Sequence, residues 1–473
     1  MLDKIFKSKL FLYIYTPLLF LIACAVTVHN KEVDGAILFG YIAAFFLIFS
    51  SRLTDAMYPA VLLCVFVTRC YNSAALFIEK IPYCVPIVLA IIAHFIIYKR
   101  KWRIGRSFFG LCAVALSVTL AGLGTIPPSD YFAGSALYYV FGLGVGMILF
   151  YLLVKANFTE ESGREVARIM YLMGLFACFC VLRFYFEAYD SLEAVNKLVV
   201  FQSSNNLATF LMIAMPFPLF YSSKRYFDVI SVFLIYVCVF LTGSRGGLLM
   251  GTVEFVIIFV AFAAFDKRHL LNRIFYMLIA VSFTVVIFEN LPELAAFFRF
   301  KIKPSDGGSS ILGYIIALKD YFFSEQDARL KLLDRMVADF KANPIFGVGL
   351  GYTGNEDLYR PKDGAMNWYH MWFAQVIGGL GSLGIVCYGY QLIDRIIIFF
   401  KNMNLLNFTL IMSYMGLFIM SQVNPGEFCP IPYAALAVTF FIIMEKKEDD
   451  ITFPELGKRI KDRFAKTKKL FSK

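Results

Sequence analysis

The sequence predicts an all-α, polytopic integral membrane protein with about 14 transmembrane helices, in a range of roughly 12 to 14. Hydrophobic residues make up 59% of the 473 positions and charged residues only 17%, which is more apolar surface than a soluble core can bury. Apolar runs of about 18 residues recur from Leu10 to Met444, each close to the length that crosses a roughly 30 Å hydrocarbon core. Lys and Arg gather in alternate connections, as expected of a chain that crosses a bilayer repeatedly.

The transmembrane segments are expected where the apolar runs lie. The first run follows the basic stretch MLDKIFKSK and has no small-residue cleavage site, so we expect it to be retained as a helix. The predicted segments are 10–29, 35–50, 56–72, 81–98, 105–125, 133–154, 169–189, 205–221, 227–242, 247–265, 274–288, 369–393, 405–422 and 431–444.

The distribution of basic residues predicts the orientation of the bundle. The connections KRKWRIGR, SSKR and DKRHLLNR and the tail GKRIKDRFAKTKKLFSK all fall on the side of the N-terminal KSK. By the positive-inside rule that side is the cytoplasm, so both termini are expected there. The tail is expected to lie as a basic amphipathic stretch on anionic membrane lipids.

One connection is much longer than the others and is expected on the external, periplasmic side. It divides the chain into an N-terminal transmembrane bundle, the external loop, the C-terminal transmembrane helices and a basic cytoplasmic tail, at 1–288, 289–368, 369–444 and 445–473.

The external loop is expected to carry amphipathic helices. The stretch EQDARLKLLDRMVADFKANP places four apolar residues on one helical face and ends at a proline. These apolar residues are Leu330, Leu333, Val337 and Phe340. A glycine-rich turn, FGVGLGYTG, follows before the chain enters the membrane again.

Charge and cysteine usage exclude two other classes of protein. The formal net charge of +11 is explained by membrane topology, so no nucleic-acid partner is expected. The ten Cys show no CxxC pair and no Cys/His ligand spacing, so neither a zinc site nor a disulfide framework is expected. We predict no cofactor.

Arg245 stands in the stretch LTGSRGGLL, at the external mouth between two predicted spans. Gly246 and its neighbouring glycines allow a ligand to approach the backbone closely, and a guanidinium donates two parallel hydrogen bonds to phosphate oxygens. This pattern predicts an anion-binding concavity. The alternative is an interfacial arginine whose side chain reaches the headgroups.

Other external arginines are candidates for the same anion. Arg183 is followed one helical turn later by Glu187, so an internal ion pair is the alternative for it. Arg329 and Arg335 could lie on a solvated helix face, and Arg360 could be a simple loop charge. A cationic pocket for a diphosphate would explain why positive charge gathers in this one external loop.

His370 is the histidine placed where the external loop returns to the bilayer, preceded by Asn367, Trp368 and Tyr369. An imidazole that titrates near neutrality suits a general base that takes a proton from an attacking hydroxyl. The alternative is a satisfied interfacial histidine.

A competing site lies in the first external loop, where Glu32 and Asp34 could hold a divalent cation on a diphosphate. Because the external candidates are mainly cationic, metal-free binding is favoured. A transporter could also use a cationic cavity, but no related halves are visible in the sequence.

Taken together, these motifs resemble the O-antigen ligase and polymerase family of bacterial surface-polysaccharide assembly. The resemblance rests on SSNNLATFL, TGSRGG, ARLKLLDRMVADFKANPIFGVGLG and YHMWFAQVIGGLGSLG, in this order between Gln202 and Val386. It implies a GT-C-like membrane glycosyltransferase that acts at the outer face of the bacterial cytoplasmic membrane.

The resemblance also implies roles for individual residues. Arg245 and Arg329 would contact the diphosphate of an undecaprenyl-linked glycan donor, and His370 would be the catalytic histidine. The family usually places Asn after that histidine, whereas this chain has Met371, and Asn367 could take the missing polar role. Asn206, in SSNNLATFL, is a further supporting residue. The acceptor is either another lipid-linked glycan or a lipid A-core sugar, and an exporter of the same lipid-linked glycan is the alternative function.

Overall fold

The computed structural model describes residues 9–29, 31–70, 81–125, 140–158, 161–187, 204–221, 225–265, 270–290, 326–350, 369–424, 426–428, 431–445 and 450–471. Regular structure in these residues is helical, without strands, and one isolated bridge pairs Ile104 with Ile451. The all-α prediction is therefore confirmed for the part of the chain that is described.

The helices follow one another in three groups along the chain. The first group consists of α2 (Lys9–Val28), α3 (Glu32–Phe49), α4 (Leu53–Cys70), the 3-10 helix η2 (Ile81–Cys84), α6 (Val85–Tyr98), α7 (Ser107–Leu120), the π-helical η3 (Val140–Val145), α9 (Gly146–Asn157) and α10 (Ser162–Glu187). The second consists of α12 (Ser204–Ala214), α13 (Phe217–Tyr221), α14 (Arg225–Leu241), α15 (Arg245–Phe265) and α16 (Leu270–Asn290). The third consists of α19 (Gln326–Ala342), α21 (Trp372–Lys401), α22 (Leu405–Ser421), α23 (Ile431–Met444) and α24 (Phe453–Phe471).

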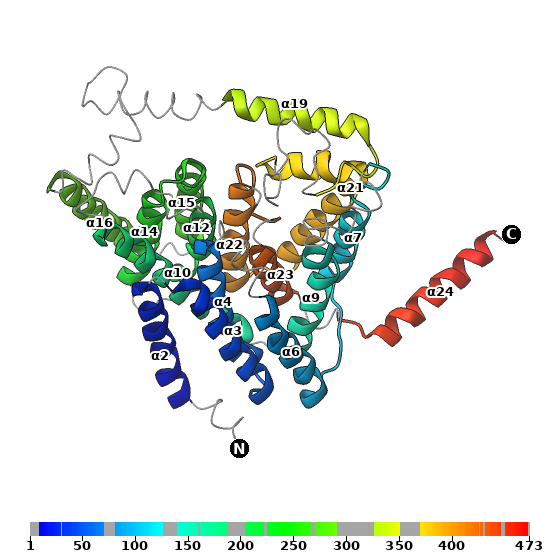
Figure 1. Ribbon diagram of the computed structural model, residues 1–473, viewed down its shortest axis with the longest axis horizontal. Helices are drawn as coiled ribbons and strands as arrows, with labels where there is room; N and C mark the ends of the chain where they lie inside the picture. Colours follow the sequence, from blue (N-terminus) through cyan, green and yellow to red (C-terminus); the bar gives the residue numbers. More distant parts are fainter. Residues whose placement is uncertain are drawn as a thin grey trace.

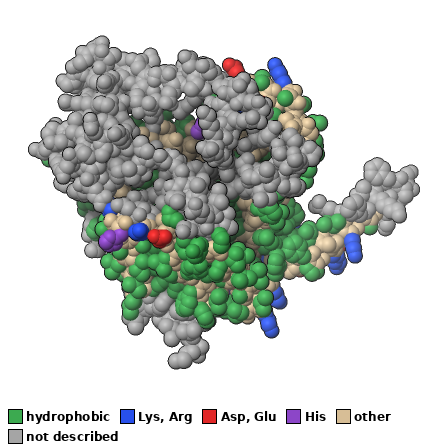
Figure 2. Space-filling model, in the orientation of Figure 1, with side chains coloured by type: hydrophobic (Ala, Val, Ile, Leu, Met, Phe, Trp, Pro, Cys, Tyr) green, Lys and Arg blue, Asp and Glu red, His purple; other side chains and the backbone are tan. Residues whose placement is uncertain are grey.

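These helices form one bundle with a cap at one end. In Figure 1 the start of α2 lies at the bottom of the bundle, α19 lies across the top, and α24 projects away from the side. The side of the bundle is covered by apolar side chains, as Figure 2 shows for its lower half. Such a surface fits a lipid environment, since soluble proteins rarely expose apolar patches of this extent.

Three helical stretches are both long and apolar enough to cross a membrane, namely Val140–Asn157, Ser162–Arg183 and Trp372–Lys401. Eleven shorter apolar helices of 10–17 residues accompany them among the described residues. The chain is thus a helical protein suited to a membrane, while the number of crossings stays a prediction.

Proline and glycine explain why two predicted spans are broken. The span predicted at 205–221 divides into α12 and α13 because Pro216 cannot donate the hydrogen bond that would continue the helix. Helix α21 is kinked at Gly381, whose φ of +65° lies in the left-handed region. The kink brings the start of α21 under α19, where it contacts the segment that follows α19 (Figure 1).

The connection 99–106 lies at the end of the bundle that the basic residues predict to face the cytoplasm, and its backbone pairs with the residues before α24. Ile104 and Ile451 exchange two backbone hydrogen bonds of 2.9 and 3.0 Å. Thr452 and Glu455 then cap the start of α24 reciprocally, with Thr452 N donating to Glu455 Oε2 at 2.7 Å. The backbone hydrogen bond from Thr452 lowers the pKa of the Glu455 carboxyl.

Candidate functional site

The turn between α14 and α15 is built by its own short polar side chains. Ser244 caps α15 because its Oγ accepts a hydrogen bond from Gly247 N at 2.9 Å. The same hydroxyl donates to Asn205 Oδ1 of α12 at 2.5 Å. Gly243 in this turn has a φ of +70°, which explains the glycine in the sequence TGSRGG. The backbone of Arg245 is thereby fixed as the first residue of α15.

Gly246 and Gly247 allow α15 to approach its neighbours closely. A Cβ at Gly246 would lie 2.7 Å from Val423 Cγ2 and 3.6 Å from Met420 Cε, and one at Gly247 would lie 2.7 Å from Ala208 Cβ. The glycines are therefore needed for packing, and they bring the predicted anion-binding turn against the last turn of α22.

Asn206 is the centre of a second set of contacts at this end of the bundle. It is buried, and its Oδ1 accepts a hydrogen bond from Asn424 Nδ2 at 3.2 Å. Its backbone carbonyl accepts a hydrogen bond from the Tyr433 hydroxyl at the start of α23. The start of α12, the residues after α22 and the start of α23 are joined in this way through the side chain and the backbone carbonyl of Asn206.

The segment after α19 docks on the kink of α21 backbone to backbone. Val348 N donates to Gly378 O at 3.0 Å and Gly349 N donates to Gly379 O at 2.9 Å. Gly347 has a φ of +64°, and a Cβ there would lie 2.4 Å from the carbonyl carbon of Gly379. Only glycine fits this contact, which explains the motif FGVGLG.

A small apolar cluster fixes α19 over the start of α21. Leu332, Tyr369, Met371 and Ala374 are buried together, with Leu333 and Met336 packed against them. The Tyr369 hydroxyl donates to Asp339, which also accepts from Arg335 Nε at 3.2 Å. The predicted apolar face of this helix is only partly right, because Leu333 packs inward whereas Val337 is 43% exposed.

His370 lies at the junction between this cluster and α21. Its side chain is exposed, while Tyr369 and Met371 on either side are buried. Its φ of +54° is a conformation that costs a non-glycine residue about 1–2 kcal/mol, so the flanking contacts impose it. The chain is therefore held in a shape that turns the imidazole out of the packed cluster.

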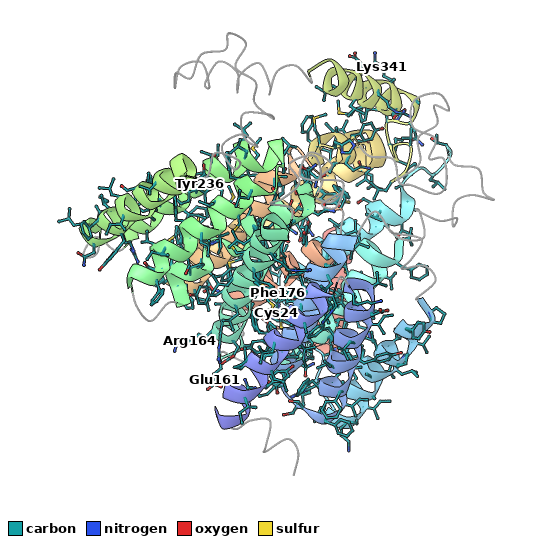
Figure 3. All side chains as sticks on the ribbon, turned by 60° about the vertical axis from the view of Figure 1, so that its left-hand side comes forward. Cys24, Glu161, Arg164, Phe176, Tyr236 and Lys341 are labelled. Carbon is teal, nitrogen blue, oxygen red and sulfur yellow. The ribbon has the colours of Figure 1, made fainter. Side chains whose placement is uncertain are left out.

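The Arg245 turn and the His370 segment meet the same helix end. The Trp372 ring lies 5.4 Å from that of Phe418 in α22, and Gly246 packs against Met420 and Val423 a few residues farther along. Trp372 Nε1 is buried without a hydrogen-bond acceptor among the described residues. Both Figure 1 and Figure 3 place α19 at this end of the bundle, opposite the Glu161 and Arg164 end of α10.

The other predicted arginines differ in their surroundings. Arg183 is buried and donates to the backbone carbonyls of Thr27 and Val28, at 2.8 Å for Val28, so it caps the end of α2. Arg335 is also buried rather than solvated, and it pairs with Asp339. The side chains of Arg245 and Arg329 lie outside the described residues, although their backbones belong to α15 and α19.

Several predicted residues fall beyond what the structure describes. Arg360 and Asn367 lie outside the described residues, as do the side chains of Glu32 and Glu187. Asp34 is exposed at the start of α3. Among the described residues no three His, Cys, Asp or Glu side chains gather as a metal site.

His94 illustrates a histidine with a purely internal role. It is fully buried, and its ring nitrogens lie 2.7 Å from Leu47 O and 2.7 Å from Asn157 Oδ1. The two histidines therefore differ in exposure, since the His94 ring is buried and the His370 side chain is exposed.

Comparison with known families matches the part of the chain that includes the Arg245 turn and the His370 segment. Residues 230–389, from α14 into α21, match the family model described as O-antigen ligase. This part of the chain is therefore similar to that family. The similarity agrees with the resemblance seen in the motifs and supports glycosyl transfer of the ligase or polymerase type in general. No curated protein matches the chain.

Sequence reasoning missed Asn424 and Tyr433, which contact Asn206 and belong to no motif that marks them as functional. Trp372 lies in the stretch YHMWFAQVIGGLGSLG, but nothing in that stretch singled it out. A weak signal existed in the turn NPGEFCP, where an amide precedes helix-breaking residues after α22.

Proposed function

We propose that this protein is a metal-independent, inverting glycosyltransferase that moves glycan from an undecaprenyl diphosphate carrier to an acceptor sugar hydroxyl. It would serve O-antigen, capsule or other surface-polysaccharide assembly, either as a polymerase of repeat units or as a ligase to lipid A-core. One observation supports the proposal most strongly. The Arg245 turn and the His370 segment, 125 residues apart in the numbering, both pack on the stretch of α22 and its end from Phe418 to Val423.

The proposed reaction is a single displacement at the anomeric carbon. His370 accepts the proton of the acceptor hydroxyl while that oxygen forms a bond to the anomeric carbon. The bond from this carbon to the carrier diphosphate breaks at the same time, and the diphosphate leaves with the electron pair. Attack from the face opposite to the leaving group inverts the configuration.

Arg245 and Arg329 are proposed to hold the departing diphosphate, with Arg360 as a further cation from the external loop. Negative charge grows on the diphosphate in the transition state, where a fixed donor can contribute about 3–4 kcal/mol. Gly246 was predicted to let the diphosphate approach the backbone, but its open side faces Val423 and Met420, so we propose that it serves packing of α15 instead. Asn206 and Asn367 are proposed as supporting residues.

Arg183 and Arg335 were predicted as direct ligands of the diphosphate, but their internal contacts favour another role. Arg183 ties the end of α2 to α10, and Arg335 with Asp339 and Tyr369 ties α19 to α21. We therefore propose them as positioning residues that keep the external end of the bundle in shape.

We propose a location in the bacterial cytoplasmic membrane, with both termini in the cytoplasm and the site facing the periplasm. The basic connection 99–106 and the basic helix α24 lie away from α19, which supports this orientation (Figure 1).

Transfer in detergent tests the function, because no transport can occur there. Purified protein with a lipid-linked donor and acceptor should form a glycosylated product, and Arg245→Ala and His370→Ala should each lower the rate at least 100-fold. Arg164→Ala, at the opposite end of the bundle, is the matched control and should act as wild type.

Two outcomes would redirect the proposal. Loss of transfer in EDTA would point to a metal held by Glu32 and Asp34. Glycan movement across vesicles without any product in detergent would favour an exporter.

A further inference from the structure

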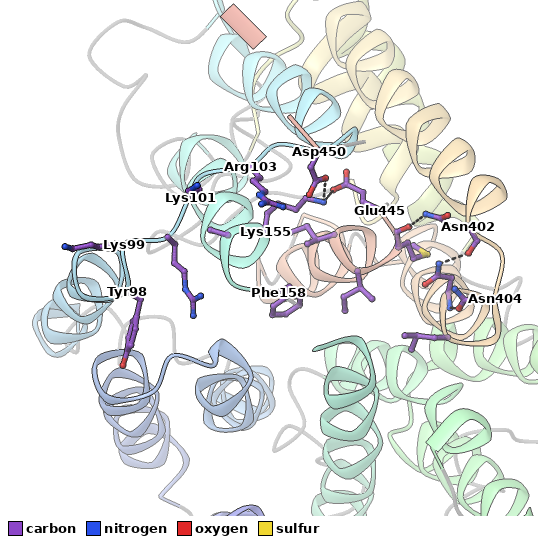
Figure 4. Close-up of a pocket in the computed structure, with 17 residues that line it drawn as sticks. Tyr98, Lys99, Lys101, Arg103, Lys155, Phe158, Asn402, Asn404, Glu445 and Asp450 are labelled. Carbon is purple, nitrogen blue, oxygen red and sulfur yellow. Dashed lines mark hydrogen bonds and ion pairs between the residues drawn. The ribbon is translucent and has the colours of Figure 1, made fainter. Parts of the chain in front are cut away.

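A large pocket lies at the end of the bundle opposite α19. It measures about 760 Å³ and opens among the connection after α6, the end of α9, the turn between α21 and α22 and the end of α23 (Figure 4). We define the basic pocket by its charged lining: Lys99, Arg100, Lys101, Arg103 and Lys155 against Glu445 and Asp450.

One cation, Lys155, pairs with both carboxylates of the basic pocket and balances one of their two charges. Lys155 is buried, and its Nζ lies 2.8 Å from Glu445 Oε2 and 2.7 Å from Asp450 Oδ1. Figure 4 shows these three side chains together, with Arg103 beside Asp450. The remaining negative charge faces Arg103, which interacts with Asp450. Positive charge is still in excess in the connection 99–103, because Lys99 and Lys101 form no ion pair with any described residue.

The connection that carries these cations is held in one conformation. Gly105 N donates to the Tyr151 hydroxyl at 2.8 Å, and Ser107 N and Oγ donate to Glu445 Oε1 at 2.5 and 2.6 Å. Arg100 Nη2 donates to the backbone carbonyl of Ser51 at 2.5 Å, which fixes the start of the connection. The backbone that carries the cations is therefore preorganised, so an anion would have to order only the exposed side chains on binding.

The wall of the basic pocket opposite the cations is partly apolar, and the amides of Asn402, Asn404 and Asn407 line the rest. Phe158, Leu406, Ile442 and Ile443 face the same space as the cations. Trp102, between Lys101 and Arg103, is 40% exposed and stacks on Phe95 with ring centroids 5.1 Å apart. Exposed Trp residues are typical of the headgroup level of a membrane protein. An anion with an apolar body therefore fits this pocket better than a fully polar one.

We propose that the basic pocket binds a phosphate ester group, and that its source is an anionic phospholipid of the cytoplasmic leaflet. Lys99, Lys101 and Arg103 would contact the phosphate oxygens, and the apolar wall would cover the glycerol and the first acyl carbons. The proposal concerns a site separate from the external one and does not depend on glycosyl transfer.

Native mass spectrometry of the full chain tests this binding. Phosphatidylglycerol and phosphatidylcholine of equal chain length are added separately to protein in detergent, and bound lipids are counted at increasing concentration. The double variant Lys99→Gln/Lys101→Gln is compared with Arg164→Gln/Arg168→Gln, which removes two charges from the start of α10, outside the pocket lining. Unfolding temperatures of both variants establish that they fold.

Wild type and the α10 control should prefer phosphatidylglycerol, while the pocket variant should bind it roughly 10- to 30-fold more weakly and lose the preference. Inorganic phosphate at millimolar concentration is the second probe. If it binds in a Lys99- and Lys101-dependent way while the two lipids bind equally, the phosphate site stands and its ligand is soluble. Equal binding of both probes by wild type and pocket variant overturns the proposal.

Discussion

Gly347→Ala is the change whose consequence the structure specifies most fully. The new Cβ would lie 2.4 Å from Gly379 C and 2.6 Å from Leu380 N, which are backbone atoms that cannot rotate away. The φ of +64° adds about 1–2 kcal/mol for an L side chain. Separation of the segment 347–349 from α21 would also remove the hydrogen bonds donated by Val348 N and Gly349 N, each worth about 1 kcal/mol net.

The sum is roughly 3–4 kcal/mol, which corresponds to a 100- to 1000-fold shift toward the undocked segment. Hydrogen exchange followed by mass spectrometry should show this as lost protection of the amides in 344–350, together with a lower transfer rate because His370 is no longer held. Gly389→Ala is the matched control, since a Cβ at that position of α21 meets nothing within 4 Å. Protection of 344–350 that is equal in the two variants would refute the docking contact as described.

Three further changes test the buried polar groups. Arg395→Met should lower the free energy of unfolding by about 3–5 kcal/mol, because it leaves Glu427, 2.7 Å away, as an unpaired buried carboxylate. The double variant with Glu427→Leu should recover most of that loss, and thermal unfolding measures both. Tyr369→Phe should loosen α19 by about 1–3 kcal/mol because the buried Asp339 loses a donor, and limited proteolysis within α19 should report it, whereas unchanged cleavage would speak against the contact. Glu254→Met should raise the unfolding temperature, because Glu254 is 1% exposed and neither carboxylate oxygen has a hydrogen-bond partner among the described residues. A lower unfolding temperature would show that the carboxyl group is needed.

Much of the helical architecture could be predicted from apolar run length alone. The predicted segment 431–444 coincides with α23, and the segment 405–422 differs from α22 by one residue at its end. Proline also predicted the end of α19 correctly, because the helix stops at Ala342, two residues before Pro344. These features are local, so a single sequence contains enough information to find them.

The parts that could not be predicted depend on contacts between distant segments. The sequence contains both glycine motifs, but nothing in it says that Gly347 lies against Gly379, because that contact depends on the kink at Gly381. The face of α19 was misjudged for a similar reason. Apolar periodicity cannot predict that Arg335 is buried, because its burial depends on Asp339, which pairs with Arg335 and also accepts a hydrogen bond from Tyr369.

The central claim is that the Arg245 turn binds the carrier diphosphate while His370 accepts the proton of the acceptor hydroxyl. Measuring donor affinity and the rate of glycan transfer on the same variants separates these two roles most directly. Affinity for undecaprenyl diphosphate and undecaprenyl monophosphate would be measured for wild type, Arg245→Ala and His370→Ala, with single-turnover transfer on the same samples. His370→Ala is expected to bind the diphosphate as wild type does and to transfer at least 100-fold more slowly, whereas Arg245→Ala should lose its preference for the diphosphate. Wild-type transfer by His370→Ala, or an unchanged diphosphate preference in Arg245→Ala, would contradict the claim.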